Sequence, residues 1–275
     1  HAKLLILDEP TSSLNETDSK ALLDLMLKFK KEGMTSIIIS HKLNEVAYVA
    51  DKITVIRDGS TIETMDKHTT EISEDRIIQG MVGRELTDRF PKRHDVKIGD
   101  VNMEVKNWTV HHPLYPERKV CDDVSIKVRK GEVVGISGLM GAGRTELAMS
   151  IFGQSYGTNI SGQLFLDGKE VHLKTIKQAI KNKLAYVTED RKGNGLVLTN
   201  PIKINTTLAN LDSISPRMVI DKDKEYQVAE EYRGKLKTKC PTVEQNVGNL
   251  SGGNQQKVLL AKWMFTDPDV LILDE

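Results

Sequence analysis

The chain alternates between short apolar runs and longer segments whose apolar positions recur at helical spacing. Residues 4–7 and 35–40 have the length and composition of buried strands, and residues 184–187 form a further strand-like run. Between the first two runs, residues 15–32 carry apolar positions at helical spacing, and Gly33 follows them. Strands that alternate with helices in this way predict an α/β fold with a mainly parallel sheet.

Other segments predict antiparallel pairing and a helical region. Residues 53–57 and 61–64 read as a hairpin around Asp58-Gly59, and residues 103–110 and 120–128 alternate like antiparallel strands. The remaining predicted elements are helices at 43–50 and 73–81, a strand at 163–166, and a charged, mostly helical stretch at 203–238. We therefore expect an antiparallel β subdomain and a helical subdomain beside the core.

A glycine-rich turn follows an apolar run at residues 132–136, which predicts a buried strand, and precedes a helix that ends near residue 152. A phosphate-binding loop requires this context, because backbone N–H groups and a helix N-terminus then converge on phosphate oxygens. The candidate nucleotide-binding residues of this loop are Gly138, Gly141, Ala142, Gly143, Arg144 and Thr145. Arg144 stands where such loops usually have Lys, and arginine keeps the charge but is larger and fork-shaped.

An internal repeat suggests two related domains. Residues 5–9 and residues 271–275 both read LILDE, at an offset of 271 − 5 = 266 residues, about the size of one nucleotide-binding domain. The sequence therefore predicts a partial tandem and a fragment of a longer protein. The expected parts are the C-terminal part of a first domain at 1–82, a polar linker at 83–100, and a second domain at 101–275. A hybrid core, in which residues 1–65 complete the second domain, is an open alternative to the tandem arrangement.

The composition of the chain argues against some classes of protein. With 39 basic and 39 acidic residues there is no overall charge that would draw the chain to nucleic acid. Cys121 and Cys240 are the only cysteines, too few for a disulfide framework, and no apolar run has the length of a membrane helix.

Residues 250–257 read LSGGNQQK and are followed by the apolar run that ends in Asp274-Glu275. This pair resembles the signature and Walker B elements of ATP-binding-cassette (ABC) ATPases. The resemblance implies a P-loop NTPase core that uses ATP and Mg²⁺. It gives Glu9 and Glu275 the role of polarising the attacking water, and His41 that of a switch histidine that contacts the γ-phosphate.

The same resemblance assigns further residues. The metal ligands it implies are Asp8, Thr145, Asp274 and Glu189, the last standing where the family usually has Gln. Ser251, Gly252, Gly253 and Gln255 are the implied nucleotide contacts of the signature. In the family these act across a head-to-tail pair of domains, so each site combines residues of both. Tyr115 either stacks on adenine or is an ordinary surface residue.

The combination of GAGRT, EDRK and LSGGNQQK in a tandem chain is similar to the ATP-binding subunits of bacterial monosaccharide importers. That resemblance implies an ATPase at the cytoplasmic face of the cell membrane, which drives monosaccharide uptake through membrane permease subunits and, indirectly, a periplasmic sugar-binding protein. The fragment alone is expected to be inactive. The alternatives are a soluble ABC ATPase of the DNA-repair or translation type, and a regulatory, non-hydrolysing second domain, which Arg144 favours.

Overall fold

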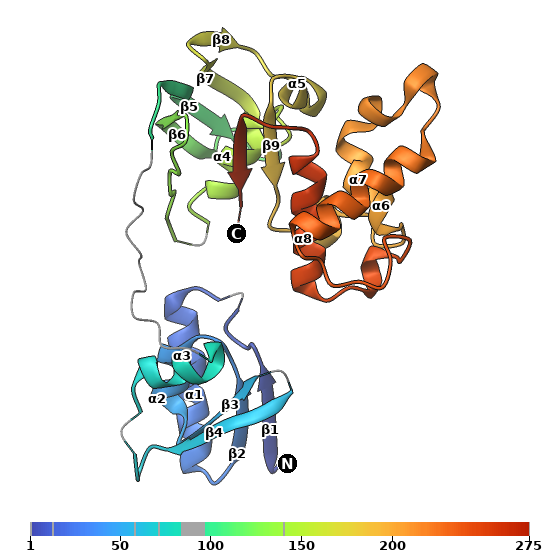
Figure 1. The fold of residues 1–275 in the computed structure, drawn as a ribbon. Helices are drawn as coiled ribbons and strands as arrows, with labels where there is room; N and C mark the ends of the chain where they lie inside the picture. Colours follow the sequence, from blue (N-terminus) through green and yellow to red (C-terminus); the bar gives the residue numbers. More distant parts are fainter. Residues whose placement is uncertain are drawn as a thin grey trace. The chain divides into compact units, whose positions relative to one another are not determined.

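The computed structural model describes residues 2–12, 14–57, 59–70, 72–83, 97–139 and 141–274. The chain divides into two compact units, His1–Asp95 and Val96–Glu275, and each is described by itself (Figure 1).

Unit 1 begins with a parallel strand pair covered by helices. Strands β1 (Leu4–Asp8) and β2 (Thr35–Ile39) pair in parallel, with Leu4 opposite Thr35 and Asp8 opposite Ile39. Helix α1 (Glu16–Lys31) joins them, and helix α2 (Leu43–Val49) follows β2. Leu23 and Met26 of α1 and Val49 of α2 are buried in one apolar cluster, against which Leu7 of β1 and Ile38 of β2 pack. The predicted helix at 15–32 is thus confirmed.

A hairpin and a third helix complete unit 1. Strands β3 (Lys52–Arg57) and β4 (Ser60–Asp66) pair antiparallel, and helix α3 (Glu74–Val82) packs on β3. Ser73 caps α3 by accepting a hydrogen bond from the Arg76 N–H, and Gly83 ends it in the left-handed conformation. Most of the predicted linker lies outside the described residues, so the boundaries 1–82, 83–100 and 101–275 stay predictions.

Unit 2 contains an antiparallel sheet of four strands in the order β6-β5-β7-β8 (Figure 1). Its strands are β5 (Val101–His111), β6 (Lys119–Arg129), β7 (Thr158–Leu166) and β8 (Lys169–Val171). Helix α4 (Arg144–Ile151) follows the glycine-rich loop, and α5 (Ile176–Lys181) leads to the next strand. This sheet is the predicted antiparallel β subdomain.

Strands β9 (Leu184–Val187) and β10 (Val270–Leu273) form a parallel pair, with Ile272 opposite Tyr186. One apolar core joins them to α4 and to the antiparallel sheet, and it includes Phe152, Trp263 and Trp108. Phe152 and Trp263 meet edge to face, with ring centroids 5.3 Å apart.

The helical part lies between β9 and β10. A π-helical turn (Arg191–Gly195) precedes α6 (Ile202–Thr207), two 3₁₀ segments (Leu208–Ile214 and Pro216–Met218) and α7 (Lys222–Lys235). A 3₁₀ turn (Val247–Asn249) then leads into α8 (Gly252–Met264). This confirms the predicted helical stretch.

Two expectations about strands are wrong. Residues 132–136 are not a strand, and Val133 and Ile136 expose 73% and 53% of their surface. No strand among the described residues pairs with this segment, so its backbone groups lack the partner that a strand requires. The expected mainly parallel sheet is also wrong, because the described strands form two parallel pairs and four antiparallel ones. In the described part of the chain, no helix combines the length and the apolar character needed to cross a membrane.

Candidate functional site

In unit 1, Glu9 and His41 meet at the carboxyl ends of two parallel strands. Glu9 directly follows β1 and His41 comes two residues after β2, so the parallel register brings both to one edge. His41 Nδ1 lies 2.8 Å from Glu9 Oε1, and the imidazole N–H donates to the carboxylate. Both side chains are accessible to solvent, with 38% of Glu9 and 67% of His41 exposed. The predicted pair is therefore in hydrogen-bond contact and open to a substrate.

The backbone at Glu9 is strained. Its φ of +47° lies in the left-handed region, which costs a residue with a side chain on the order of 1–2 kcal/mol. The conformation is held by a hydrogen bond from the Glu9 N–H to the Ile39 carbonyl at 2.9 Å, and by one from the Ser12 N–H to the Glu9 carbonyl at 3.1 Å. The turn thus directs the Glu9 carboxylate away from the strand and towards His41. Asp8, the implied metal ligand, is exposed at the end of β1.

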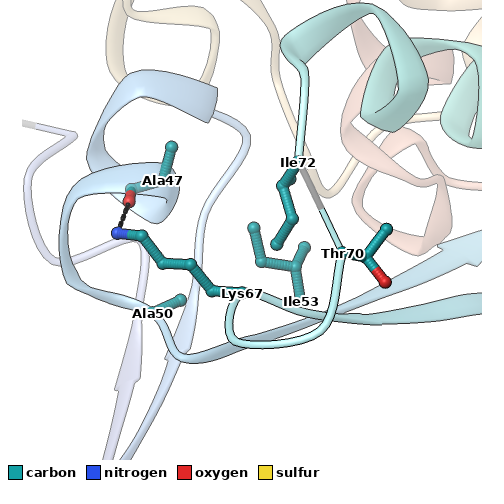
Figure 2. A pocket seen from close by; sticks show the side chains of 6 residues that line it. All are labelled: Ala47, Ala50, Ile53, Lys67, Thr70 and Ile72. Carbon is teal, nitrogen blue, oxygen red and sulfur yellow. Dashed lines mark hydrogen bonds between the residues drawn. The ribbon is translucent and has the colours of Figure 1, made fainter.

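A separate pocket of unit 1 is lined by neither Glu9 nor His41. It measures about 260 Å³ and is lined by Ala47, Ala50, Ile53, Lys67, Thr70 and Ile72 (Figure 2). Its walls are mostly alkyl, and the Lys67 ammonium donates to the Ala47 carbonyl at the end of α2.

In unit 2, the glycine-rich loop has a backbone that only glycine accepts readily. Gly141 and Gly143 have φ of +77° and +88°. A Cβ at Gly143 would lie 2.3 Å from the Val120 carbonyl oxygen, and one at Gly138 would lie 3.0 Å from the Ala142 Cβ. The loop thus presses closely on β6 while its N–H groups lead into the N-terminus of α4, as a phosphate cradle requires.

A groove of about 590 Å³ runs beside this loop. It is lined by β6, by residues 134–137 and by residues 142–144 of the loop. Beneath the loop, Cys121 Sγ lies 3.5 Å from the Gly143 carbonyl oxygen, to which it donates. Burial, with a smaller contribution from Glu146, raises the pKa of the Cys121 thiol to about 11, so the thiol stays protonated and keeps this contact at neutral pH.

Thr145 and Asp274 lie together at the edge of the loop. The Thr145 hydroxyl donates to Asp274 Oδ1 at 3.2 Å, and the Tyr186 hydroxyl donates to Asp274 Oδ2 at 2.8 Å. Burial, followed by the hydrogen bond to Asp274, raises the pKa of Tyr186. Sequence reasoning missed Tyr186; the signal was a hydroxyl inside an otherwise apolar strand, opposite the strand that ends in Asp274.

The residues around this loop fit MgATP. A threonine hydroxyl and a carboxylate are the oxygen donors that Mg²⁺ prefers, and it takes its other ligands from water and phosphates. Thr145 and Asp274 would hold the ion, and the loop N–H groups would hold the phosphates. Glu189 is exposed just beyond β9, while Glu275 lies outside the described residues.

The signature residues form the start of α8. Ser251 occupies the N-cap position and is exposed, and Asn254 Nδ2 donates to its hydroxyl at 3.0 Å. Gln255 differs, because its side chain is 5% exposed and its amide donates to the carbonyls of Val247 and Leu250. These hydrogen bonds tie Gln255 to the residues that precede the helix. The nucleotide contact of Gln255 stays a prediction.

Sequence reasoning also did not foresee how residues 191–195 are attached to α8. A Cβ on Gly252 would lie 2.9 Å from Arg191 Nη2, so the guanidinium covers the first turn of the helix. At the other end, the buried Lys262 ammonium donates to the Gly195 carbonyl and lies 4.9 Å from the Trp263 ring centroid. Residues 191–195 therefore form a π-helical turn that lies against α8 at both of its ends.

Tyr115 is exposed in the loop between β5 and β6. Its ring lies 5.1 Å from that of His112, and its N–H donates to His112 Nδ1 at 3.2 Å. An exposed aromatic face is compatible with stacking on a base, which stays a prediction.

Comparison with known proteins agrees with this geometry. The family model described as ABC transporter matches residues 121–275. The chain is 59% identical over 273 residues to the L-arabinose transport ATP-binding protein AraG of Geobacillus stearothermophilus, covering 99% of this chain and 53% of that protein. It is 51% identical over 274 residues to the xylose import ATP-binding protein XylG of Thermoanaerobacter pseudethanolicus, covering 100% of this chain and 54% of that protein. The chain spans about half the length of these curated relatives.

Solved structures show the same fold. A dimeric post-hydrolysis state of the ATP-binding cassette MJ0796 bound to ADP and Pi matches with a TM-score of 0.53 and 19% identity, over 63% of this chain and 73% of that one. A nucleotide-free ATP-binding cassette of an ABC transporter matches with a TM-score of 0.51 and 18% identity, over 64% and 69%. Together with the family match and the two relatives, these findings show that the chain belongs to the ABC transporter family and has its P-loop NTPase α/β fold.

Proposed function

We propose that this protein is the ATP-binding and ATP-hydrolysing subunit of a bacterial importer for a monosaccharide, and that the sugar is an aldopentose. The Glu9–His41 hydrogen bond of 2.8 Å at the end of two parallel strands carries the hydrolytic part of the proposal. The substrate class rests on the relatives, whose names specify L-arabinose and xylose.

The residues of the chain take part in hydrolysis in two different sites of the complete protein. In one site, the loop around Gly143 would bind phosphate through N–H groups, and Thr145 with Asp274 would hold Mg²⁺, which when bound offsets the negative charge of the phosphates. In the other site, Glu9 accepts a proton from the attacking water, while His41 fixes the direction of its carboxylate. Ser251 contributes a hydroxyl and the N-terminus of α8 from the signature.

The partner in this proposal is a membrane permease, and the chain works at the cytoplasmic face of the membrane. We assign the permease contact to residues 189–195 and the helical stretch 203–238. Arg191 lies close to Gly252, and the Lys262 ammonium donates to the Gly195 carbonyl. These contacts support the assignment, because a displacement of residues 191–195 by the permease would also displace α8 and its signature residues.

The test is transport by the complete protein, assembled with its permease and sugar-binding protein in vesicles. We expect L-arabinose or xylose on the outer side to stimulate MgATP hydrolysis and to accumulate inside. His41→Ala should abolish both, whereas His68→Ala, an exposed histidine of the same unit, should leave both near the wild-type level. Robust hydrolysis by His41→Ala would contradict the role of the pair, and uptake of neither pentose would contradict the substrate class.

A second possibility concerns unit 2 alone. Arg144 in place of the usual Lys favours a nucleotide site that binds and regulates without efficient hydrolysis. Arg144→Lys should then raise the rate of single-turnover hydrolysis at this site. An unchanged rate would remove the support for a regulatory role.

A further inference from the structure

Thr11, Lys42 and Glu45, which are close to Glu9 and His41 in the sequence, contact one another in a closed network. The Thr11 hydroxyl donates to the Glu45 carboxylate. Lys42 Nζ donates to the Thr11 carbonyl at 2.9 Å and lies 3.4 Å from Glu45 Oε1. Each of the three residues therefore contacts the other two.

Two members of this network are buried, and the third, Lys42, has 32% of its side chain exposed. Thr11 is 1% exposed and Glu45 is 8% exposed. A buried carboxylate is stable only when its oxygens are paired, and here one oxygen accepts from Thr11 while the other faces Lys42. Loss of the Thr11 hydroxyl would leave one oxygen of Glu45 without its partner. Because such a loss is costly for a buried carboxylate, the hydrogen bonds hold the three residues in place.

The network joins the two segments that carry the catalytic pair. Thr11 comes two residues after Glu9, in the turn that follows β1, whereas Lys42 directly follows His41 and Glu45 lies in the first turn of α2. Glu9 itself has a strained φ of +47°, and the turn that holds it is closed by the Ser12 N–H. A strained turn relaxes unless neighbouring contacts hold it, and the contacts of Thr11 with Lys42 and Glu45 are suited to do so.

We propose that Thr11, Lys42 and Glu45 are positioning residues, which hold the turn after β1 on α2 and so keep the Glu9 carboxylate on His41. None of the three touches the reacting atoms in this role. The proposal rests on the hydrolytic function assigned to Glu9 above, and it extends that function to three residues whose action is indirect.

The first test is steady-state and single-turnover MgATP hydrolysis by the complete protein. Thr11→Val keeps the shape and removes the hydroxyl, so kcat should fall at least about tenfold while KM for MgATP changes less than about twofold. Thr11→Ser should restore kcat to within about twofold, because it keeps the hydroxyl. Thr61→Val, at an exposed position on β4, is the matched control.

A double-mutant cycle separates positioning from general damage. Because Thr11 acts through Glu9, Thr11→Val should cause no further loss in a Glu9→Gln background. A loss of the same factor in both backgrounds, an equal loss in Thr11→Ser, or an unchanged kcat in Thr11→Val would each overturn the proposal.

A second measurement does not depend on hydrolysis. Hydrogen exchange of the Glu9 and Ser12 amides, which donate to the Ile39 and Glu9 carbonyls, should be at least about tenfold faster in Thr11→Val and close to wild type in Thr11→Ser. Unchanged exchange in Thr11→Val would overturn the positioning role. Faster exchange in a protein whose turnover does not depend on Glu9 would show that the network holds the turn but that the proposed function is wrong.

Discussion

At the scale of single residues, two buried polar side chains of unit 2, Lys262 and Tyr186, have shifted pKa values. Lys262 is 7% exposed, and its ammonium donates a hydrogen bond to the Gly195 carbonyl. Burial lowers the pKa of Lys262 to about 8, from 10.5. Tyr186 differs, because its pKa is raised and its hydroxyl stays a donor to Asp274 at any pH near neutral.

The first prediction concerns the pH dependence that Lys262 gives to stability. Between about pH 8 and 10.5 the unfolded chain binds more protons at Lys262 than the folded chain does, so the free energy of unfolding rises with pH in that window. Relative to Lys262→Met, the wild type should gain about 1 kcal/mol between pH 7 and 9, since one pKa unit corresponds to about 1.4 kcal/mol. The measurement is urea unfolding followed by the fluorescence of Trp108 and Trp263, which are both buried in unit 2.

The matched control for this prediction is Lys257→Met. Lys257 lies on the same helix and also donates to a backbone carbonyl, that of Lys237, but from the exposed surface. Its variant should follow the pH profile of the wild type. A wild-type profile that runs parallel to that of Lys262→Met would show that Lys262 does not titrate in this window.

At the scale of elements, the sequence predicted most helices and strands because their apolar spacing and caps are local. Asn15 caps α1 by accepting a hydrogen bond from the Asp18 N–H, three residues along the chain. The error at residues 132–136 has a physical reason: an apolar run reports that a segment is suited to burial, but a strand forms only where another strand pairs with it. The Thr11–Glu45 and Arg191–Gly252 contacts were not predictable, because they join residues 34 and 61 positions apart through tertiary packing.

The second prediction tests how the phosphate loop is seated on β6. Gly141→Ala and Gly143→Ala both place a side chain at positive φ, which costs about 1–2 kcal/mol. Only at Gly143 does the added methyl group also collide with a backbone carbonyl, at 2.3 Å, whereas it meets nothing within 4 Å at Gly141. Gly143→Ala should therefore lower the free energy of unfolding of unit 2 by about 2–5 kcal/mol and abolish nucleotide binding.

Gly141→Ala is the control with the same backbone conformation, and it should lose only about 1–2 kcal/mol. Tryptophan fluorescence and binding of a fluorescent ATP analogue measure both effects. Equal destabilisation by the two variants would mean that the loop does not press on β6 as the structure has it.

At the scale of the whole molecule, the repeated sequence LILDE forms one strand in each unit, and the two strands have different neighbours. In unit 1 the repeat strand β1 pairs with the strand that follows it, and its carboxylate contacts His41. In unit 2 the repeat strand β10 pairs with the preceding strand β9, and its Asp274 contacts Thr145 and Tyr186. The repeat was readable from the sequence, and the family resemblance supplied the roles of the site residues. How residues of the two units combine into composite sites stays a prediction.

The last prediction is that hydrolysis in the complete protein is asymmetric. Glu9 has a partner histidine that fixes its carboxylate, whereas the phosphate loop of unit 2 carries Arg144 in place of the usual Lys. Removal of a positioned base costs about 10²–10⁴-fold, so Glu9→Gln should reduce kcat for MgATP by that factor, and Glu275→Gln should reduce it much less. Glu32→Gln, an exposed glutamate of unit 1, serves as the control and should keep the wild-type rate. Equal losses of kcat in Glu9→Gln and Glu275→Gln would contradict the asymmetry. They would mean that both sites hydrolyse ATP at similar rates, because each substitution removes the base of one site.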